Sequence, residues 1–298
     1  MATRHRPVGT DAAAPGGRRR RSRGRLPVLF ALLLLPVPAA AETGIAGARQ
    51  ELAYTVYFGP LPALDVTTTV ETGPGHYRVE AMVAPKPWIA WALPWQARSE
   101  ASGRIGNDGT IYPEDYLATA QWGIHIRRTA LTYTAGGLHV TLEPPGDNEE
   151  REPVPAALMA DSLDPVSAVL ALLTETANGR GCPPRLPVFD GRRRFDLLTE
   201  TQADAVIPPS RYSVYAGPVT VCRLHFRSLA GGWRDGERAR FWQTEQPGAE
   251  RPPFDLELAR LHDDAPPMPV SVTGNSILGW VTVSLSSYRF VPGPVPGP

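Results

Sequence analysis

Cysteine and lysine are scarce in this chain of 298 residues, with two cysteines and a single lysine, Lys86. We attribute the rarity of lysine to genome composition and draw no functional conclusion from it. Long apolar runs are also missing. A helix that crosses a bilayer needs ~20 apolar residues, and the longest candidate, LPVLFALLLL at residues 26–35, is about half that length. A membrane anchor is therefore the weaker interpretation of this segment.

The first 41 residues have the order of a secretory signal peptide. An arginine-rich segment at 18–25 precedes the apolar run, and Ala39-Ala40-Ala41 offers a small-residue cleavage site. We predict removal of residues 1–41, a single β-rich domain at 42–290 and a disordered Pro/Gly tail at 291–298. The expected location is the periplasm, reached by the general secretory or the twin-arginine route.

Cleavage at this site would change the charge balance. Eight of the 30 basic residues and one of the 30 acidic residues would leave with the leader, so the mature chain would keep 22 and 29 and carry a net charge of −7. Nucleic-acid binding needs clustered Lys and Arg to neutralise phosphates. We therefore expect no nucleic-acid partner, and no transmembrane span in the mature protein.

The two cysteines, Cys182 and Cys222, fit an exported protein with one structural disulfide. A reactive thiol pair is the alternative, but the two positions lack the CxxC spacing. Closing a loop of this length removes chain entropy from the unfolded state, which corresponds to about 4 kcal/mol of stabilisation.

Most of the chain after the leader alternates apolar and polar residues with a period of two, which indicates half-buried strands. Short turn sequences separate these runs, so consecutive strands should form antiparallel hairpins. Among the expected turns are Asn107-Asp108-Gly109, Gly136-Gly137 and Gly274-Asn275.

The stretch 161–226 combines three different elements. Asp164 and Pro165 are typical of a helix start, and the apolar positions from Val166 to Leu173 predict one short helix. A hairpin should follow, with strands 186–189 and 192–198 around an Asp190-Gly191 turn. Residues 219–226 should then form a core strand that carries Cys222.

Two features of the sequence suggest ligand binding. The tryptophans of the segment 87–95 either cap the core or form an exposed apolar surface that meets lipid or an acyl group. Arginines of the hairpin either contact an anion or lie solvated with their stems over apolar neighbours. The apolar face of the expected helix is a third candidate surface. The predicted ligand-binding residues from these three places are Trp88, Trp91, Trp95, Val166, Leu170, Arg192 and Arg194.

Motifs for catalysis and cofactors are not evident. The chain has no G-x-S-x-G sequence, and the glycine-rich segment 103–109 lacks the following helix that a phosphate loop requires. His262-Asp263-Asp264 is the only local cluster of metal-ligand types, and a polar turn explains it better. We expect no catalytic residues, no metal and no cofactor.

Several segments together resemble an exported bacterial family, the domain of unknown function 3108. These are the L-x-Y-x-V-Y start, GRIGNDGTIYPEDY, DPVSAVLALL, VFDGRRRFDL, the V-x-V-C-R strand and GWVTVSL. The resemblance implies no catalytic role, because the family has no established activity. Its succession of strands is similar to the envelope lipoprotein carriers, in which a concave sheet holds acyl chains under a helix, and this is an analogy of fold alone.

The expected fold is all-β, a large curved antiparallel sheet (half-barrel or open barrel) with one short helix. The expected function is non-enzymatic binding of an apolar or envelope-derived ligand, such as a lipid, or assistance in envelope assembly. A hydrolase of an envelope polymer is the first alternative, and it would need two carboxylates facing each other across a cleft. A scaffold that docks a partner protein is the second.

Overall fold

The computed structural model describes residues 47–144, 150–236, 240, 246–249, 251–263, 265–276 and 279–292. The expected signal peptide at 1–41 lies outside this part of the chain. So do Asp264 of the expected polar turn and residues 293–298 of the expected tail.

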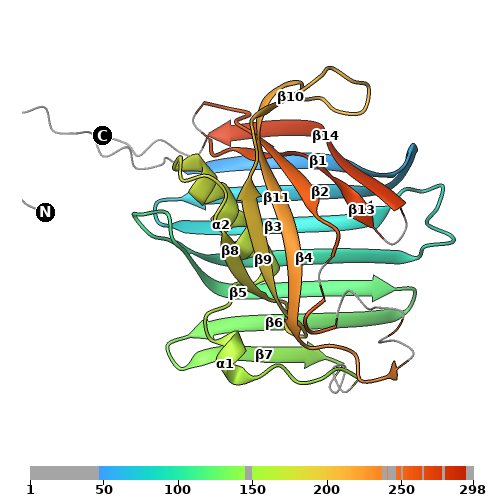
Figure 1. Ribbon diagram of the computed structural model, residues 1–298, viewed down its shortest axis with the longest axis vertical. Coiled ribbons are helices and arrows are strands. Elements are labelled where there is room, and N and C mark those ends of the chain that lie inside the picture. Colours follow the sequence, from blue (N-terminus) through green and yellow to red (C-terminus); the bar gives the residue numbers. More distant parts are fainter. Residues whose placement is uncertain are drawn as a thin grey trace, which may run out of the picture. The chain divides into compact units, whose positions relative to one another are not determined.

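Within this part of the chain the strands form a 14-stranded sheet (Figure 1). Their bounds are β1 (Ala48–Phe58), β2 (Leu61–Gly73), β3 (His76–Pro85), β4 (Trp95–Ile105), β5 (Ile111–Trp122), β6 (His125–Thr134), β7 (Gly137–Glu143), β8 (Arg185–Phe189), β9 (Arg194–Thr201), β10 (Ala205–Ile207), β11 (Gly217–Ala230), β12 (Phe254–Ala259), β13 (Met268–Ser276) and β14 (Gly279–Pro292).

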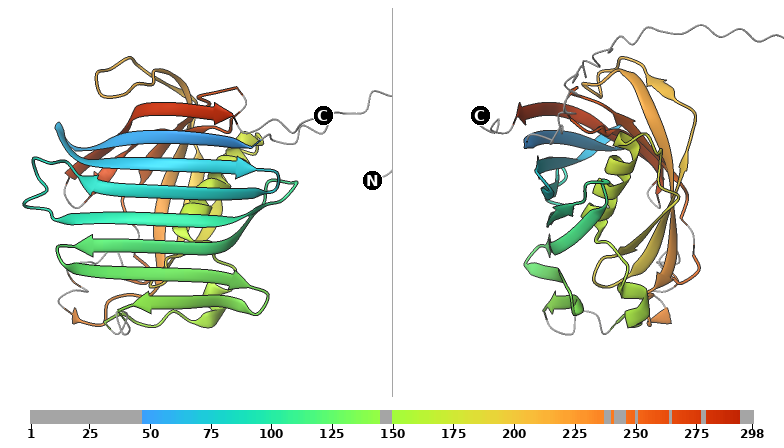
Figure 2. Two further views of the ribbon diagram at one scale, coloured as in Figure 1. Left: turned by 180° about the vertical axis from the view of Figure 1, so that it is seen from behind. Right: turned by 90° about the vertical axis from the view of Figure 1, so that its left-hand side faces the viewer.

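The sheet has two halves joined by β14. The order is β7-β6-β5-β4-β3-β2-β1-β14-β13-β12-β11-β9-β8, and β10 pairs with β11 off this path. Each pair of neighbours is antiparallel. The second half crosses over one face of the β1–β7 half (Figure 2). The described strands leave β7 and β8 as two edges, so the sheet is open, and the predicted all-β fold is confirmed.

Helix α2 (Pro165–Ala177) lies between the two halves (Figure 2). The Asp164 side chain caps its first turn by accepting from the N–H groups of Val166 and Ser167, as the sequence predicted. The prediction of one helix was incomplete. A second helix, α1 (Ala156–Met159), spans only four residues and buries none of them, so it leaves no apolar periodicity in the sequence.

The core joins both halves of the sheet to α2. Leu131 on β6, Leu172 on α2, Val188 on β8 and Leu258 on β12 are almost completely buried in one apolar cluster. Burial of such side chains contributes about 1.5–3 kcal/mol each, so the cluster is the main source of stability between the layers. The space directly beneath α2 is therefore filled by side chains.

A buried polar chain fixes the start of α2 to the sheet. The Tyr77 hydroxyl on β3 lies 2.7 Å from the Ser167 hydroxyl, which donates to the Asp164 carboxylate at 2.5 Å. Burial raises the pKa of Asp164 above its ordinary value, although the hydrogen bonds from Ser167 and Val166 act in the opposite direction. Burial also raises the pKa of Tyr77.

Replacement of Asp164 by alanine should lower the free energy of unfolding by about 2 kcal/mol, because two N–H groups lose their cap and Ser167 loses its acceptor. Asp164→Asn keeps an acceptor oxygen and should retain most of the stability. A raised native pKa means that Asp164 stabilises the fold below its unfolded-state pKa and loses this contribution as the pH rises through the native value. Denaturant unfolding of the wild type and both variants should show this pH dependence of the free energy of unfolding in the wild type and its loss in Asp164→Asn. Its persistence there would contradict the assignment.

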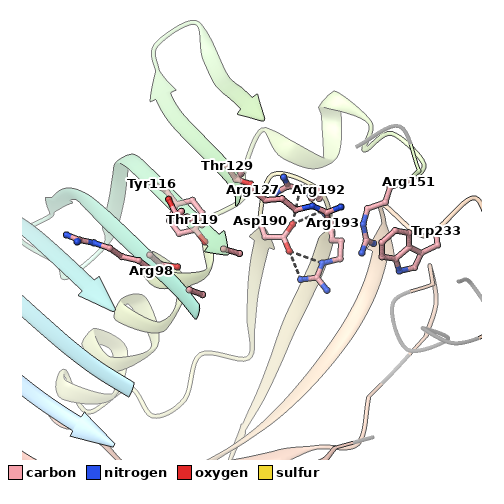
Figure 3. Close-up of a pocket in the computed structure, with 14 residues that line it drawn as sticks. Arg98, Tyr116, Thr119, Arg127, Thr129, Arg151, Asp190, Arg192, Arg193 and Trp233 are labelled. Carbon is pink, nitrogen blue, oxygen red and sulfur yellow. Dashed lines mark hydrogen bonds and ion pairs between the residues drawn. The ribbon is translucent and has the colours of Figure 1, made fainter. Parts of the chain in front are cut away.

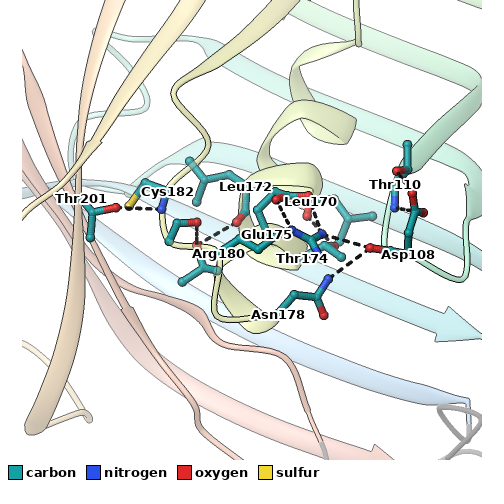
Figure 4. A network of polar contacts seen from close by, with 12 residues as sticks. Asp108, Thr110, Leu170, Leu172, Thr174, Glu175, Asn178, Arg180, Cys182 and Thr201 are labelled. Atoms are coloured by element: carbon teal, nitrogen blue, oxygen red, sulfur yellow. Dashed lines mark hydrogen bonds and ion pairs between the residues drawn. The ribbon is translucent and has the colours of Figure 1, made fainter. Parts of the chain in front are cut away.

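The far end of α2 is held by the β4–β5 turn (Figure 4). Arg180 donates to the Asp108 carbonyl at 3.0 Å and pairs with Glu175 at 2.5 Å. Asn178 donates to the same carbonyl at 3.5 Å. The predicted Asn107-Asp108-Gly109 turn therefore both reverses the chain and anchors the helix.

The predicted disulfide between Cys182 and Cys222 is confirmed, with a Cα–Cα distance of 5.8 Å. Cys222 is fully buried on β11, and the N–H of Cys182 donates to the Thr201 hydroxyl at 2.9 Å (Figure 4). The bond ties the segment that enters β8 to the strand beyond β9. It thus cross-links the second half of the sheet to itself.

Three predicted boundaries were wrong. Gly274-Asn275 is not a turn, because both residues pair with β14 inside β13. Its glycine serves close packing instead, since a Cβ at Gly274 would lie 2.5 Å from the Phe254 ring. The hairpin turn spans Asp190–Arg193 and not two residues, because Phe189 pairs with Arg194. Strand β14 also continues to Pro292, so its last two residues lie within the expected tail.

Candidate functional site

A cavity of about 540 Å³ lies on the face of the sheet that α2 and the second half cover, near the β8–β9 turn (Figure 3). We call it the arginine cavity. It is lined by Ala97, Arg98, Ser99, Tyr116, Ala118, Thr119, Ala120, Arg127, Thr129, Arg151, Asp190, Arg192, Arg193 and Trp233.

Small side chains form the floor of the arginine cavity. They come from neighbouring strands β4, β5 and β6, and antiparallel register places them in cross-strand rows. The rows are Ser99 with Ala118 and Thr129, and Ala97 with Ala120 and Arg127. Alanine and serine at these positions leave the volume that larger side chains would fill.

The β8–β9 turn forms one wall. The Asp190 carboxylate accepts from the N–H groups of Arg192 and Arg193, at 2.9 and 2.7 Å, and pairs with the Arg193 guanidinium at 2.7 Å. These bonds set the turn conformation with Gly191 at φ +90°. A Cβ at Gly191 would lie 2.2 Å from Thr129 Cγ2, so only glycine allows the turn to approach β6 this closely.

Two further contacts complete the wall. The Arg192 guanidinium donates to the Thr129 hydroxyl, which links the turn to β6. The Arg151 guanidinium lies 3.7 Å from the centroid of the Trp233 ring and donates to the Gly231 carbonyl at 2.9 Å. Figure 3 shows Arg127 and Arg192 near the Asp190 turn and Arg151 beside Trp233.

The charge of this lining is strongly positive by residue type, with five arginines and one aspartate. Arg98 belongs to the lining but its side chain points away (Figure 3), where it pairs with Glu80 at 2.7 Å and Glu100 at 3.0 Å. The other four arginines surround the hollow. Guanidinium groups bind carboxylate and phosphate through paired N–H donors, so this arrangement suits an anionic group.

The residues predicted to bind ligand are dispersed. Arg192 lines the arginine cavity, whereas Arg194 is buried and bonded to Asp196 and to the carbonyls of Leu158 and Phe195.

The apolar candidates lie elsewhere. Leu170 is buried in the core, and Val166 packs against the core cluster. Neither residue lines the arginine cavity. Trp88 and Trp91 are exposed in the β3–β4 loop, and Trp95 begins β4. Their roles in binding stay predictions.

Sequence reasoning found only Arg192 among the lining residues and missed the others, of which Arg127, Arg151 and Trp233 are the most informative. The period-two alternation of β6 could have placed Arg127 on the same face as Thr129 and Leu131. Arg151 and Trp233 are brought together by an isolated bridge between residues 82 positions apart, and no local pattern signals that contact.

Acidic groups are few at this site. Asp190 is the one carboxylate among the fourteen lining residues, and the turn uses its oxygens. Burial raises the pKa of Tyr116 at the cavity floor. Across the described positions, no group of three or more His, Cys, Asp or Glu side chains is placed to hold a metal ion.

In the part of the chain that the structure describes, neither helix has the length and hydropathy that a bilayer-spanning helix requires.

An open antiparallel sheet that encloses one helix and carries an arginine-lined hollow places this chain among β-sheet proteins with a candidate small-molecule site. The chain belongs to the family described as "Protein of unknown function (DUF3108)", whose model matches residues 53–257. The resemblance stated from the sequence is thus confirmed. The family description assigns no activity.

Two solved structures are similar to this chain at low identity. One is a β-barrel-like protein of the domain of unknown function DUF1849 from Brucella abortus, with 11% identity, a TM-score of 0.45, and coverage of 83% of this chain and 98% of that one. The other is a domain provisionally assigned to outer membrane lipoprotein sorting from Vibrio parahaemolyticus, with 9% identity, a TM-score of 0.22, and coverage of 85% and 89%. No curated protein matches the chain significantly.

Proposed function

We propose that this chain binds a small anionic amphiphile of the cell envelope in the arginine cavity, without chemical turnover, and that it works in the periplasm. The observation that carries the proposal is the combination of a floor of alanine and serine with a wall of arginines in one hollow of about 540 Å³. That volume is within the range of about 300–1,000 Å³ that is typical of small-molecule sites.

The two parts of the cavity suit the two parts of such a ligand. The floor rows of β4 and β5 present methyl groups and one hydroxyl to an acyl or other apolar portion. Arg127, Arg151, Arg192 and Arg193 present guanidinium donors to a carboxylate or phosphate. An amphiphile with its acidic group at the β8–β9 turn would satisfy both.

The compartment is supported by the disulfide. Two buried cysteines joined at a sequence separation of 40 are typical of an oxidising environment outside the cytoplasm. The expected leader agrees with this inference, and an envelope amphiphile is the ligand class available there.

The experiment that tests this proposal compares two adjacent arginines of β6. Arg127 lines the cavity, whereas Arg128 points to the opposite face and pairs with Glu143 at 3.1 Å. Both are exposed. Arg127→Gln should weaken binding of dodecyl phosphate, used below its micelle concentration, at least about tenfold, because a hydrogen bond to a charged group contributes about 1.5–3 kcal/mol. Arg128→Gln should bind like the wild type in isothermal titration calorimetry.

A neutral ligand of the same chain length, dodecyl maltoside, should bind more weakly than dodecyl phosphate and should not distinguish the two variants. Native mass spectrometry of protein purified from the periplasm should show a retained acidic amphiphile in the wild type and less of it in Arg127→Gln. Equal affinity of both variants for dodecyl phosphate would refute the cavity as the anion site.

A further inference from the structure

Seven large apolar side chains are exposed along one end of the sheet, and we call this set the apolar rim. Trp91 and Ile124 are the most exposed, at 85% and 91%. The set is Leu61, Trp88, Trp91, Trp122, Ile124, Ile126 and Trp280.

Topology explains why these residues meet. In an antiparallel meander every second turn lies at the same end of the sheet. The turns after β1, β3 and β5 and the start of β14 therefore share one end, on the right-hand side of Figure 1, where the β5 arrow points. Three hydrogen bonds agree: the Gly59 N–H donates to the Trp280 carbonyl, the Gly123 N–H to the Pro94 carbonyl, and the Trp88 indole N–H to the Pro62 carbonyl.

The opposite end of the same half has a different character. Its turns lie in residues 71–78, 104–112 and 133–138, and among the described residues the large apolar side chains exposed there are Tyr112 and, at the end of β14, Val291. Charged side chains such as Glu71, Arg78 and Asp108 occupy these segments. The apolar rim is therefore a property of one end and not of the sheet's turns in general.

Two of the four tryptophans of the rim, Trp88 and Trp91, present their rings and not their polar atoms. The Trp88 N–H donates to the Pro62 carbonyl at 2.8 Å, and the Trp91 N–H donates to the Trp88 carbonyl at 3.0 Å. A ring whose donor is already satisfied can enter a less polar medium at little cost. Solvent exposure of so much apolar area is otherwise uncommon in monomeric proteins.

The charge of the rim also favours an anionic surface. Residues 57–64, 84–97, 118–128 and 279–286 contain no aspartate or glutamate but include Lys86, His125, Arg127 and Arg128. Lys86 pairs with Asp65, just outside the rim, and Arg128 with Glu143. Asp65 and Glu143 are thus each matched by a cation, and His125 and Arg127 lie at the same end, so the rim carries no excess of negative charge that would repel lipid phosphates.

We propose that the apolar rim seats this protein on the surface of an anionic lipid bilayer, with Trp88, Trp91 and Ile124 inserted among the headgroups. Tryptophan is enriched at this depth in membrane-associated proteins because its ring is large and amphipathic. The rim stands apart from the cavity proposal, since none of its seven apolar side chains lines the cavity. The two are nevertheless close: Ala120 and Arg127 of the cavity lie two residues, or about 7 Å, from the ends of β5 and β6 at the rim.

The test is flotation with vesicles of phosphatidylethanolamine and phosphatidylglycerol in a 3:1 ratio, using the full exported chain. The wild type should float with the vesicles. Trp91→Ser/Ile124→Ser should lower the partition coefficient at least tenfold without lowering Tm, because both side chains project into solvent. Tyr112→Ser/Val291→Ser removes two exposed apolar side chains away from the rim and should float like the wild type.

Failure of the wild type to float would overturn the proposal, and so would equal flotation of all three proteins. The cavity proposal is tested separately by dodecyl phosphate binding without vesicles, which Trp91→Ser/Ile124→Ser should retain. If Arg127→Gln leaves dodecyl phosphate binding unchanged while the flotation pattern holds, the rim stands and the cavity proposal falls.

Discussion

Replacement of both cysteines by serine is expected to lower Tm by about 8–16 °C. The bond joins residues 40 positions apart, and the loop-entropy relation gives about 4 kcal/mol for a closure of that size. A change of 1 kcal/mol moves Tm by about 2–4 °C in a domain of this length. Cys182→Ser/Cys222→Ser also leaves two hydroxyls in the core, where Cys222 is fully buried, so the loss should not fall below this estimate.

Calorimetry of the double variant, with and without a reducing agent, gives the measurement and its control. Reduction of the wild type should reproduce the shift, whereas the variant should not respond to the reductant. A Tm that is the same in both proteins would show that the bond adds nothing to stability. The cavity should keep its affinity at low temperature, since neither cysteine lines it.

Local patterns were sufficient for most of the sheet and for α2. The first three strands alternate cleanly, and each half-buried run became a strand paired with its neighbour. Asp164 and Pro165 marked the helix start because capping is a property of adjacent residues. The disulfide followed from composition and compartment, since a lone cysteine pair leaves a single possible connectivity.

The wrong turn assignments show where local information ends. Gly274-Asn275 has the composition of a turn, but the Phe254 ring occupies the space beside Gly274 and the chain stays extended. The Asp190 turn was placed correctly but made too short, because its length is set by the carboxylate that accepts two N–H groups further along. In both cases a contact outside the dipeptide decided the conformation.

The candidate site was less predictable than the fold. Arg192 was found because a run of three arginines is conspicuous, whereas Trp233 reaches the cavity only through pairing with Arg151. The apolar rim repeats this pattern. Trp88 and Trp91 stood out in sequence, but Ile124 and Trp280 join them only through strand register.

Gly231→Ala should lower the free energy of unfolding by about 2–5 kcal/mol and weaken dodecyl phosphate binding more than tenfold. Gly231 has φ +84°, where a residue with a Cβ costs about 1–2 kcal/mol. The new Cβ would lie 2.1 Å from the Arg192 carbonyl oxygen and 2.8 Å from Arg193 Cα. Both atoms belong to backbone, so relief of the overlap moves the turn and adds about 1–3 kcal/mol. Displacement of that turn removes Arg192 and Arg193 from their places around the hollow.

Gly179→Ala separates the two causes. Gly179 has φ +72° with no atom within 4 Å of the position of its Cβ, so alanine there should cost only the conformational term of about 1–2 kcal/mol. Dodecyl phosphate affinity should stay at the wild-type level, because the residue follows α2 and lies outside the cavity lining. Denaturant unfolding and calorimetric titration of both variants supply the comparison. If Gly231→Ala cost no more stability than Gly179→Ala and left binding intact, the close approach of residue 231 to the arginine turn would have no part in shaping the cavity.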